Sequence, residues 1–260
     1  MDELEQALRR IDGRQYGAYK DLPRDAGGAR LRLRIDHVQG DPFAAPSRLA
    51  LRVPLGRAGW PAETLADPER ALALRDLLAR RLAVVCRDAS RSRGSGKSGV
   101  VTSDAPGQQI LDTTAVTLSA DAVEARIRVG LPAQGRRVRG REAAALLLET
   151  LPALAEDVLL ASSWDPDQVE AHLDAYVDHC ALVREVEARE WVGFVAEDSL
   201  LPRASGVDDQ PLEGGLRFMA PEALRETVEL PHAGTVHGMA LPRGVTLIVG
   251  GGYHGKSTLL

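Results

Sequence analysis

The residues best suited to chemistry lie in one short stretch, Gly250 to Thr258, which reads GGGYHGKST. Its spacing is Gly-x-x-x-x-Gly-Lys-Ser, the pattern of a phosphate-binding loop. Small residues let the backbone N–H groups surround a polyphosphate, and the helix that follows adds positive potential. The pattern predicts that Lys256, the catalytic cation, reaches the β- and γ-phosphates of a nucleotide and that the Ser257 hydroxyl ligates Mg²⁺. The predicted nucleotide ligands are Gly250, Gly251, Gly252, Tyr253, His254, Gly255, Lys256, Ser257 and Thr258.

Two elements must position this loop. Residues 245–249, VTLIV, form a short β-branched run that predicts a buried strand directly before the loop. The sequence after Lys256, Ser-Thr-Leu-Leu, is suited to a helix start. The alternative is a glycine-rich turn that matches the pattern by chance, and the predicted strand and helix argue against it.

A second Gly-Lys-Ser, at 96–98, does not meet the same test. Arg91 stands where the first glycine of the pattern should be, and residues 99–102 favour a strand over a helix. We therefore exclude it as a nucleotide site. The Ser/Gly-rich segment 87–99 that contains this tripeptide is expected to be a flexible loop, and its arginines and lysine suit contacts with nucleic-acid phosphates. A solvated, partly disordered loop is an open alternative. Together with a second basic cluster, the candidate nucleic-acid residues are Arg87, Arg91, Arg93, Lys97, Arg136, Arg137, Arg139 and Arg141.

Charge is distributed unevenly along the chain. Residues 1–141 carry 25 Lys and Arg against 17 Asp and Glu, whereas residues 142–260 carry 7 against 20. Such asymmetry suggests two parts with different partners, the first facing a polyanion. The other open interpretation is that arginine simply replaces lysine on an ordinary surface.

The pattern of apolar residues predicts an α/β chain of two domains, 1–165 and 166–260. Residues 31–35 alternate leucine or isoleucine with arginine, and residues 123–129 alternate apolar residues with Glu124, Arg126 and Arg128, so each predicts a half-buried strand. Helices are expected at 3–11, 64–85, 143–161 and 167–190, and further strands at 49–53, 113–118, 192–195, 225–230 and 234–239. Within 64–85, Asp67-Pro68 is the expected helix start. Asp165-Pro166 can cap a helix and marks the expected boundary.

Composition points to the cytoplasm. The first ten residues, MDELEQALRR, lack the apolar segment of a signal peptide, and no apolar run approaches the roughly 18 residues of a membrane span. The two cysteines, Cys86 and Cys180, lie far apart and suggest a reducing compartment.

Several motifs together resemble a known family, the predicted ATPases of the ABC class. The matching stretches are DHVQGDPFAAPSR at 36–48, GSGKSG with PGQQIL within 94–111, GLPAQGRRVRGREA at 130–143, LPRASGVDDQPL at 201–212 and the segment 241–260. The resemblance implies an α+β N-terminal domain followed by an ABC-type nucleotide-binding domain. It carries the nucleotide role onto Gly250 to Ser257, and it implies a homodimer and an RNA or other nucleic-acid partner.

The family's later motifs, including its signature sequence and catalytic glutamate, have no counterpart in these 260 residues. We therefore expect the front part of a longer protein, cut after the loop, which alone binds ATP weakly or not at all and does not turn it over. Three functions stay open: part of an ATPase that acts on a nucleic acid, a nucleic-acid-binding module without ATPase activity, and a scaffold in which both features are structural.

Overall fold

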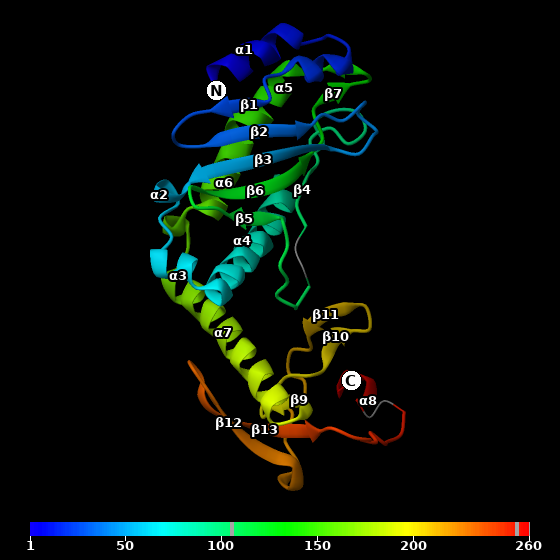
Figure 1. Cartoon of the computed structure of the whole chain (residues 1–260). Helices are drawn as coiled ribbons and strands as arrows, with labels where there is room; N and C mark the ends of the chain where they lie inside the picture. Colours follow the sequence, from blue (N-terminus) through cyan, green and yellow to red (C-terminus); the bar gives the residue numbers. More distant parts are fainter. Residues whose placement is uncertain (105–106, 253–254, 260) are drawn as a thin grey trace. The chain divides into compact units, whose positions relative to one another are not determined.

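The computed structural model describes residues 1–104, 107–252 and 255–259, and the chain forms two compact units (Figure 1). Unit 1 comprises Met1–Pro106 and Ile110–Glu170, and unit 2 comprises Gly107–Gln109 and Ala171–Leu260. Both mix helices with strands, so the α/β class is confirmed. All strand pairs within the described residues are antiparallel.

Unit 1 is built around a sheet of order β1-β2-β3-β6-β4, with β5 also pairing β6. Its strands are β1 (Asp25–Gly27), β2 (Arg32–His37), β3 (Ser47–Pro54), β4 (Val101–Thr102), β5 (Val116–Leu118) and β6 (Ala122–Val129), and β7 (Ala133–Gln134) and β8 (Arg137–Val138) form a separate hairpin. Its helices are α1 (Asp2–Ile11), η1 (Tyr16–Asp21), α2 (Leu55–Ala58), α3 (Ala62–Ala66), α4 (Pro68–Ala89), α5 (Gly140–Ala144), the π-helix η2 (Ala145–Thr150), α6 (Leu151–Leu159) and η3 (Ala161–Ser163).

Helices α4 and α6 cover one face of this sheet (Figure 1). The alternation of side chains explains which face they cover, because the odd-numbered residues of β6, from Val123 to Val129, are all buried. The opposite face carries Arg126 and Arg128, which are exposed, and the buried Glu124. One sheet face is thus apolar and helix-covered, and the other is charged.

Local sequence sets the ends of the long helices. The Asp67 carboxylate accepts hydrogen bonds from the backbone N–H groups of Glu69 (2.8 Å) and Arg70 (3.0 Å), so it caps α4, and Pro68 occupies the first turn. Asp165 accepts likewise from the Asp167 N–H, at 3.0 Å, where α7 begins. The predicted starts of both helices are confirmed.

Pro152 does not interrupt the helical region from α5 to α6. The turn before it, Ala145–Thr150, widens into a π-helix, and the Thr150 hydroxyl donates to the Ala145 carbonyl at 3.2 Å. A proline lacks an N–H donor and crowds the carbonyl four residues earlier, so a widened turn accommodates it. The predicted helical region is confirmed, with Pro152 in the first turn of α6.

Two tyrosines anchor the N-terminal segment against the segment that follows β6. The Tyr19 hydroxyl donates to the Pro132 carbonyl at 2.6 Å, and the Tyr16 hydroxyl donates to the Leu131 carbonyl at 3.2 Å. The rings meet edge to face, with centroids 5.1 Å apart. Burial raises the pKa of both phenols well above the usual value of 10, so both stay neutral and keep donating.

Unit 2 contains a sheet of order β12-β13-β9 and a separate β10–β11 hairpin. Its elements are β9 (Trp191–Ala196), β10 (Arg203–Ser205), β11 (Asp208–Pro211), η4 (Glu222–Leu224), β12 (Arg225–Leu230), β13 (Gly234–Pro242) and α8 (Lys256–Leu259), and α7 (Pro166–Ala188) begins in unit 1 and continues into unit 2. The Asp178 carboxylate holds the β12–β13 turn, because it accepts the N–H groups of His232 (2.9 Å) and Ala233 (2.7 Å). The predicted strands at 192–195, 225–230 and 234–239 are confirmed.

None of the helices in the described ranges is both long enough and apolar enough to cross a bilayer.

Candidate nucleotide-binding site

The described part of the Gly250–Thr258 loop turns directly into a helix. Gly255 has φ +77°, a left-handed conformation that favours glycine, and α8 begins at the next residue. The Gly255 carbonyl accepts the N–H groups of Thr258 and Leu259, both at 3.0 Å. The first N–H groups of a helix have no acceptor within it, so this start can offer donors to an anion. The predicted helix after the loop is confirmed.

Lys256 lies over the loop that precedes it. Its Nζ donates to the carbonyl of Gly251, and its side chain is half-buried. Ser257 and Thr258 are exposed, so their hydroxyls are accessible to a ligand. An ammonium group, exposed hydroxyls and a helix start within a few residues are a donor set that fits a polyphosphate and its Mg²⁺. Gly250, Gly251 and Gly252 are exposed, and Tyr253 and His254 lie outside the described residues.

The predicted strand at 245–249 is wrong. These residues adopt no regular structure, and the side chains of Val245, Leu247 and Val249 are 93%, 80% and 83% exposed. A strand needs a hydrogen-bonded neighbour and a cover for its apolar face. Neither is supplied to these residues within the described parts of the chain, and the apolar composition alone does not produce one.

The structure brings together only two of the predicted nucleic-acid residues, Arg93 and Arg139. The Arg139 Nη1 donates to the Arg93 carbonyl at 3.2 Å, and its Nη2 donates to the Glu142 carboxylate at 3.2 Å. Arg93 also approaches Glu142, at 3.6 Å, and donates to the Thr150 hydroxyl at 3.3 Å. These two arginines therefore connect loops to helices α5 and η2, and the Glu142 carboxylate lies between their positive charges and partly neutralises them.

The prediction of a flexible basic loop at 87–99 is also wrong. Arg87 lies in α4, and backbone bonds fix the rest: Ser95 N–H to the Ala133 carbonyl at 2.7 Å, Lys97 N–H to Pro42 at 2.8 Å and Gly99 N–H to Gly130 at 2.7 Å. The Ser98 hydroxyl is buried and accepts the N–H of Ala133 at 3.0 Å, so it is unavailable to a metal ion. A strand, β4, follows this segment, as the sequence predicted.

The other predicted nucleic-acid residues point into solvent, and no contact among the described residues gathers them. Arg137 donates from Nη1 to the Gly13 carbonyl at 3.0 Å, and Arg87 lies 4.0 Å from Asp88. The remaining members are exposed: Arg91, Lys97, Arg136 and Arg141. Sequence reasoning did not place the arginines of the open sheet face among the site residues, although their alternation along two strands was visible.

The sequence pattern of a phosphate-binding loop at a helix start is typical of P-loop nucleotide-binding proteins. Comparison with family models is more specific. Residues 1–162 match the model described as ATPase of the ABC class, N-terminal, and residues 165–260 match the ABC ATPase P-loop domain. The chain belongs to the ATPases of the ABC class, a family of ATP-binding ATPases, as the resemblance predicted. No curated protein matches it.

Proposed function

We propose that this chain binds MgATP through Gly250–Thr258 and that the protein uses ATP to act on a nucleic acid. In the site, the Lys256 ammonium leaves the Gly251 carbonyl and neutralises the β- and γ-phosphates. The Ser257 hydroxyl ligates Mg²⁺, and N–H groups at the start of α8 hold phosphate oxygens. Bound Mg²⁺ supplies further neutralisation of the phosphate charge. The observation that carries this proposal is the helix start at Lys256 directly after the left-handed Gly255.

Two observations support a nucleic-acid partner. The N-terminal part has an excess of positive charge, and the open face of its sheet carries arginines on neighbouring strands. Phosphate contacts by arginine supply most of the affinity of proteins for nucleic acids. As for ABC-class ATPases in general, we propose that two copies act together in the cytoplasm, where the thiols of Cys86 and Cys180 are free.

The test measures MgATP binding and nucleic-acid binding in the wild type and in Lys256→Ala. Lys256→Ala is expected to abolish the thermal stabilisation of the chain by MgATP, because it removes the cation that faces the phosphates. If stabilisation persists in Lys256→Ala, the assigned site is wrong.

The same variant separates the second candidate, a nucleic-acid-binding module without ATPase activity. What favours that candidate is the exposure of Val245, Leu247 and Val249, since an assembled P-loop domain buries the strand before its loop. Nucleic-acid retention in the presence and absence of MgATP is the readout. The leading proposal expects MgATP to change the affinity of the wild type but not that of Lys256→Ala, whereas the module expects no change in either protein.

A further inference from the structure

The open face of the unit 1 sheet places like charges opposite one another. Arg48 on β3 is the direct cross-strand partner of Arg128 on β6, and both side chains leave the sheet on the face away from α4 and α6. Like charges in directly opposed positions destabilise a sheet. Arg128 is neutralised by Asp104, through Nη1 at 2.9 Å and Nη2 at 2.6 Å. The hydrogen bonds and charge of Arg128 lower the pKa of Asp104, so this pair stays ionised.

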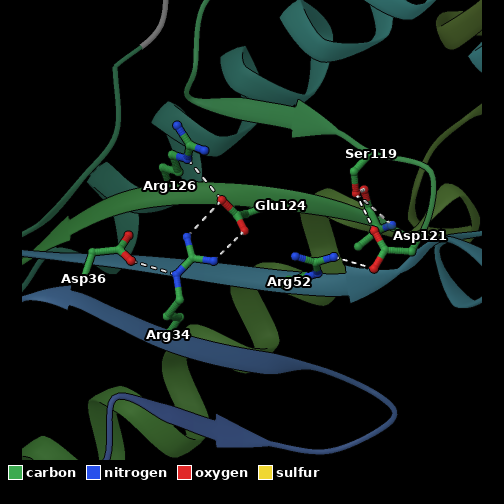
Figure 2. Close-up of polar contacts among 8 residues, drawn as sticks. Arg34, Asp36, Arg52, Ser119, Asp121, Glu124 and Arg126 are labelled. Atoms are coloured by element: carbon green, nitrogen blue, oxygen red, sulfur yellow. Dashed lines mark hydrogen bonds and ion pairs between the residues drawn. The ribbon is translucent and has the colours of Figure 1, made fainter.

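Figure 2 shows a second charge cluster on this sheet, around Glu124. Glu124 accepts from both Nη groups of Arg34 at 3.3 Å and from Nε of Arg126 at 3.1 Å. Arg34 also donates from Nε to Oδ1 of Asp36 at 2.7 Å. The Glu124 side chain is only 9% exposed, so it fixes the two guanidinium groups at the surface of the sheet. Within the described residues, the two Nη groups of Arg126 donate no hydrogen bond.

Arginines of both groups line one hollow of about 700 Å³. This volume lies within the roughly 300–1,000 Å³ of ordinary ligand sites. The sheet forms its floor, and the segments 102–104 and 113–115 complete its lining with hydroxyl groups. The charged residues in and beneath it are Arg34, Arg48, Arg126, Arg128, Asp36, Asp104 and Glu124.

Four arginines therefore meet three carboxylates, and one positive charge is left over. That charge is Arg48, which is exposed and makes no ion pair with any described residue. We infer that this hollow binds the phosphodiester backbone of single-stranded RNA, with one phosphate on Arg48 and the free Nη groups of Arg126. The inference rests on the proposed nucleic-acid role and replaces the arginines predicted from sequence with those of the sheet face.

Two features favour single-stranded RNA over other nucleic acids. A flexible strand can enter a hollow bounded by the 102–104 and 113–115 segments, whereas a rigid duplex presents its phosphates only along its outside. Asp36 accepts the hydrogen bond from Arg34 at Oδ1, so its Oδ2 can accept a hydrogen bond from a hydroxyl group of a ligand. A ribose 2′-hydroxyl is such a donor, and DNA lacks it.

The test uses the full chain and fluorescein-labelled oligouridylate, with binding followed by anisotropy over a range of KCl concentrations. Arg48→Ala is expected to make the slope of log K against log salt shallower by about 0.7, because one phosphate contact on a single strand is lost. At 0.1 M salt the same loss weakens binding about fivefold. Arg48→Glu is expected to weaken it further. The matched control is Arg136→Ala, which removes an exposed arginine outside the hollow and should leave both quantities unchanged.

Folding is checked on the same variants by thermal unfolding. Because Arg48 opposes Arg128, Arg48→Ala is expected to be at least as stable as the wild type, which excludes misfolding as the cause of weaker binding. Oligodeoxyuridylate and an RNA duplex are expected to bind more weakly than oligouridylate, and inorganic phosphate to compete only poorly.

Each adverse result has a distinct meaning. If the wild type binds no RNA, both the inference and the nucleic-acid part of the proposed function are wrong. If it binds RNA but Arg48→Ala binds equally well, or Arg136→Ala loses as much, only this location is overturned. Equal affinity for DNA or duplex overturns the single-stranded RNA assignment.

Discussion

Replacing Glu124 with alanine should loosen unit 1 while making its charged sheet face more positive. The carboxylate accepts three hydrogen bonds, two from Arg34 and one from Arg126. Hydrogen bonds to charged groups contribute about 1.5–3 kcal/mol each when they are well formed and buried. Here two of them are long, at 3.3 Å, and the Arg34 and Arg126 side chains are 39% and 46% exposed, so water replaces much of what is lost. We therefore expect a loss of about 2 kcal/mol in total.

The assay is urea unfolding in a Trp191→Phe background. Trp191 lies in unit 2, so the remaining tryptophans, Trp60 and Trp164, report on unit 1 alone. Glu124→Gln keeps an acceptor oxygen and is expected to lose about 1 kcal/mol. The control, Asp36→Ala, removes one bond from an exposed carboxylate and should lose about 0.5 kcal/mol or less.

Oligouridylate binding by the same variant is a second readout, and here the expected change is a gain instead of a loss. Glu124→Ala removes a negative charge beneath the hollow, so it is expected to strengthen oligouridylate binding while it weakens folding. If Glu124→Ala unfolds within 0.5 kcal/mol of the wild type, the buried carboxylate does not organise the face as we describe. If its RNA affinity falls together with its stability, the electrostatic part of the reasoning is refuted.

Further predictions concern the core and the loops of unit 1. Gly130→Ala should destabilise unit 1 by more than 1 kcal/mol, since its Cβ would lie 1.7 Å from a backbone oxygen, whereas Gly28→Ala, with no atom within 4 Å, should have little effect in the same urea assay. Tyr19→Phe should lose about 1 kcal/mol at neutral pH, because it removes one of two hydrogen bonds to the buried Pro132 carbonyl and leaves the bond from the Arg139 N–H at 3.1 Å. Because burial raises the pKa of Tyr19 in the fold, its contribution to stability should be constant below pH 10 and be lost above it, so stability should fall more steeply above pH 10 in the wild type than in Tyr19→Phe. Burial also raises the pKa of Cys86 to about 12, so iodoacetamide should alkylate the half-buried Cys180 first, and equal rates by mass spectrometry would contradict this.

The sequence predicted most elements correctly because their information is local. Alternation at 31–35 and 123–129 marked β2 and β6, and Asp67-Pro68 and Asp165-Pro166 marked two helix starts. These patterns depend on residues within one or two turns of each other. The same locality explains why the helix after Gly255 was predictable.

The errors concern contacts between distant residues. The 245–249 run has the composition of a buried strand, but a strand also requires a neighbour, which composition does not reveal. Arg93 and Arg139 looked like free surface charges, yet both meet Glu142 through the fold. Conversely, the uncompensated charge of Arg48 follows only from strand register, which places it opposite Arg128.

The central claim is that Gly250–Thr258 holds the phosphates of ATP, and the repeated tripeptide Gly-Lys-Ser offers the most direct test. Thermal unfolding is measured with and without saturating MgATP for the wild type, Lys256→Ala and Lys97→Ala. Ligand at 100 times its Kd stabilises a fold by about 2.7 kcal/mol. We predict that MgATP stabilises the wild type and Lys97→Ala equally and Lys256→Ala not at all. Stabilisation lost in Lys97→Ala, kept in Lys256→Ala or absent from all three would contradict the account.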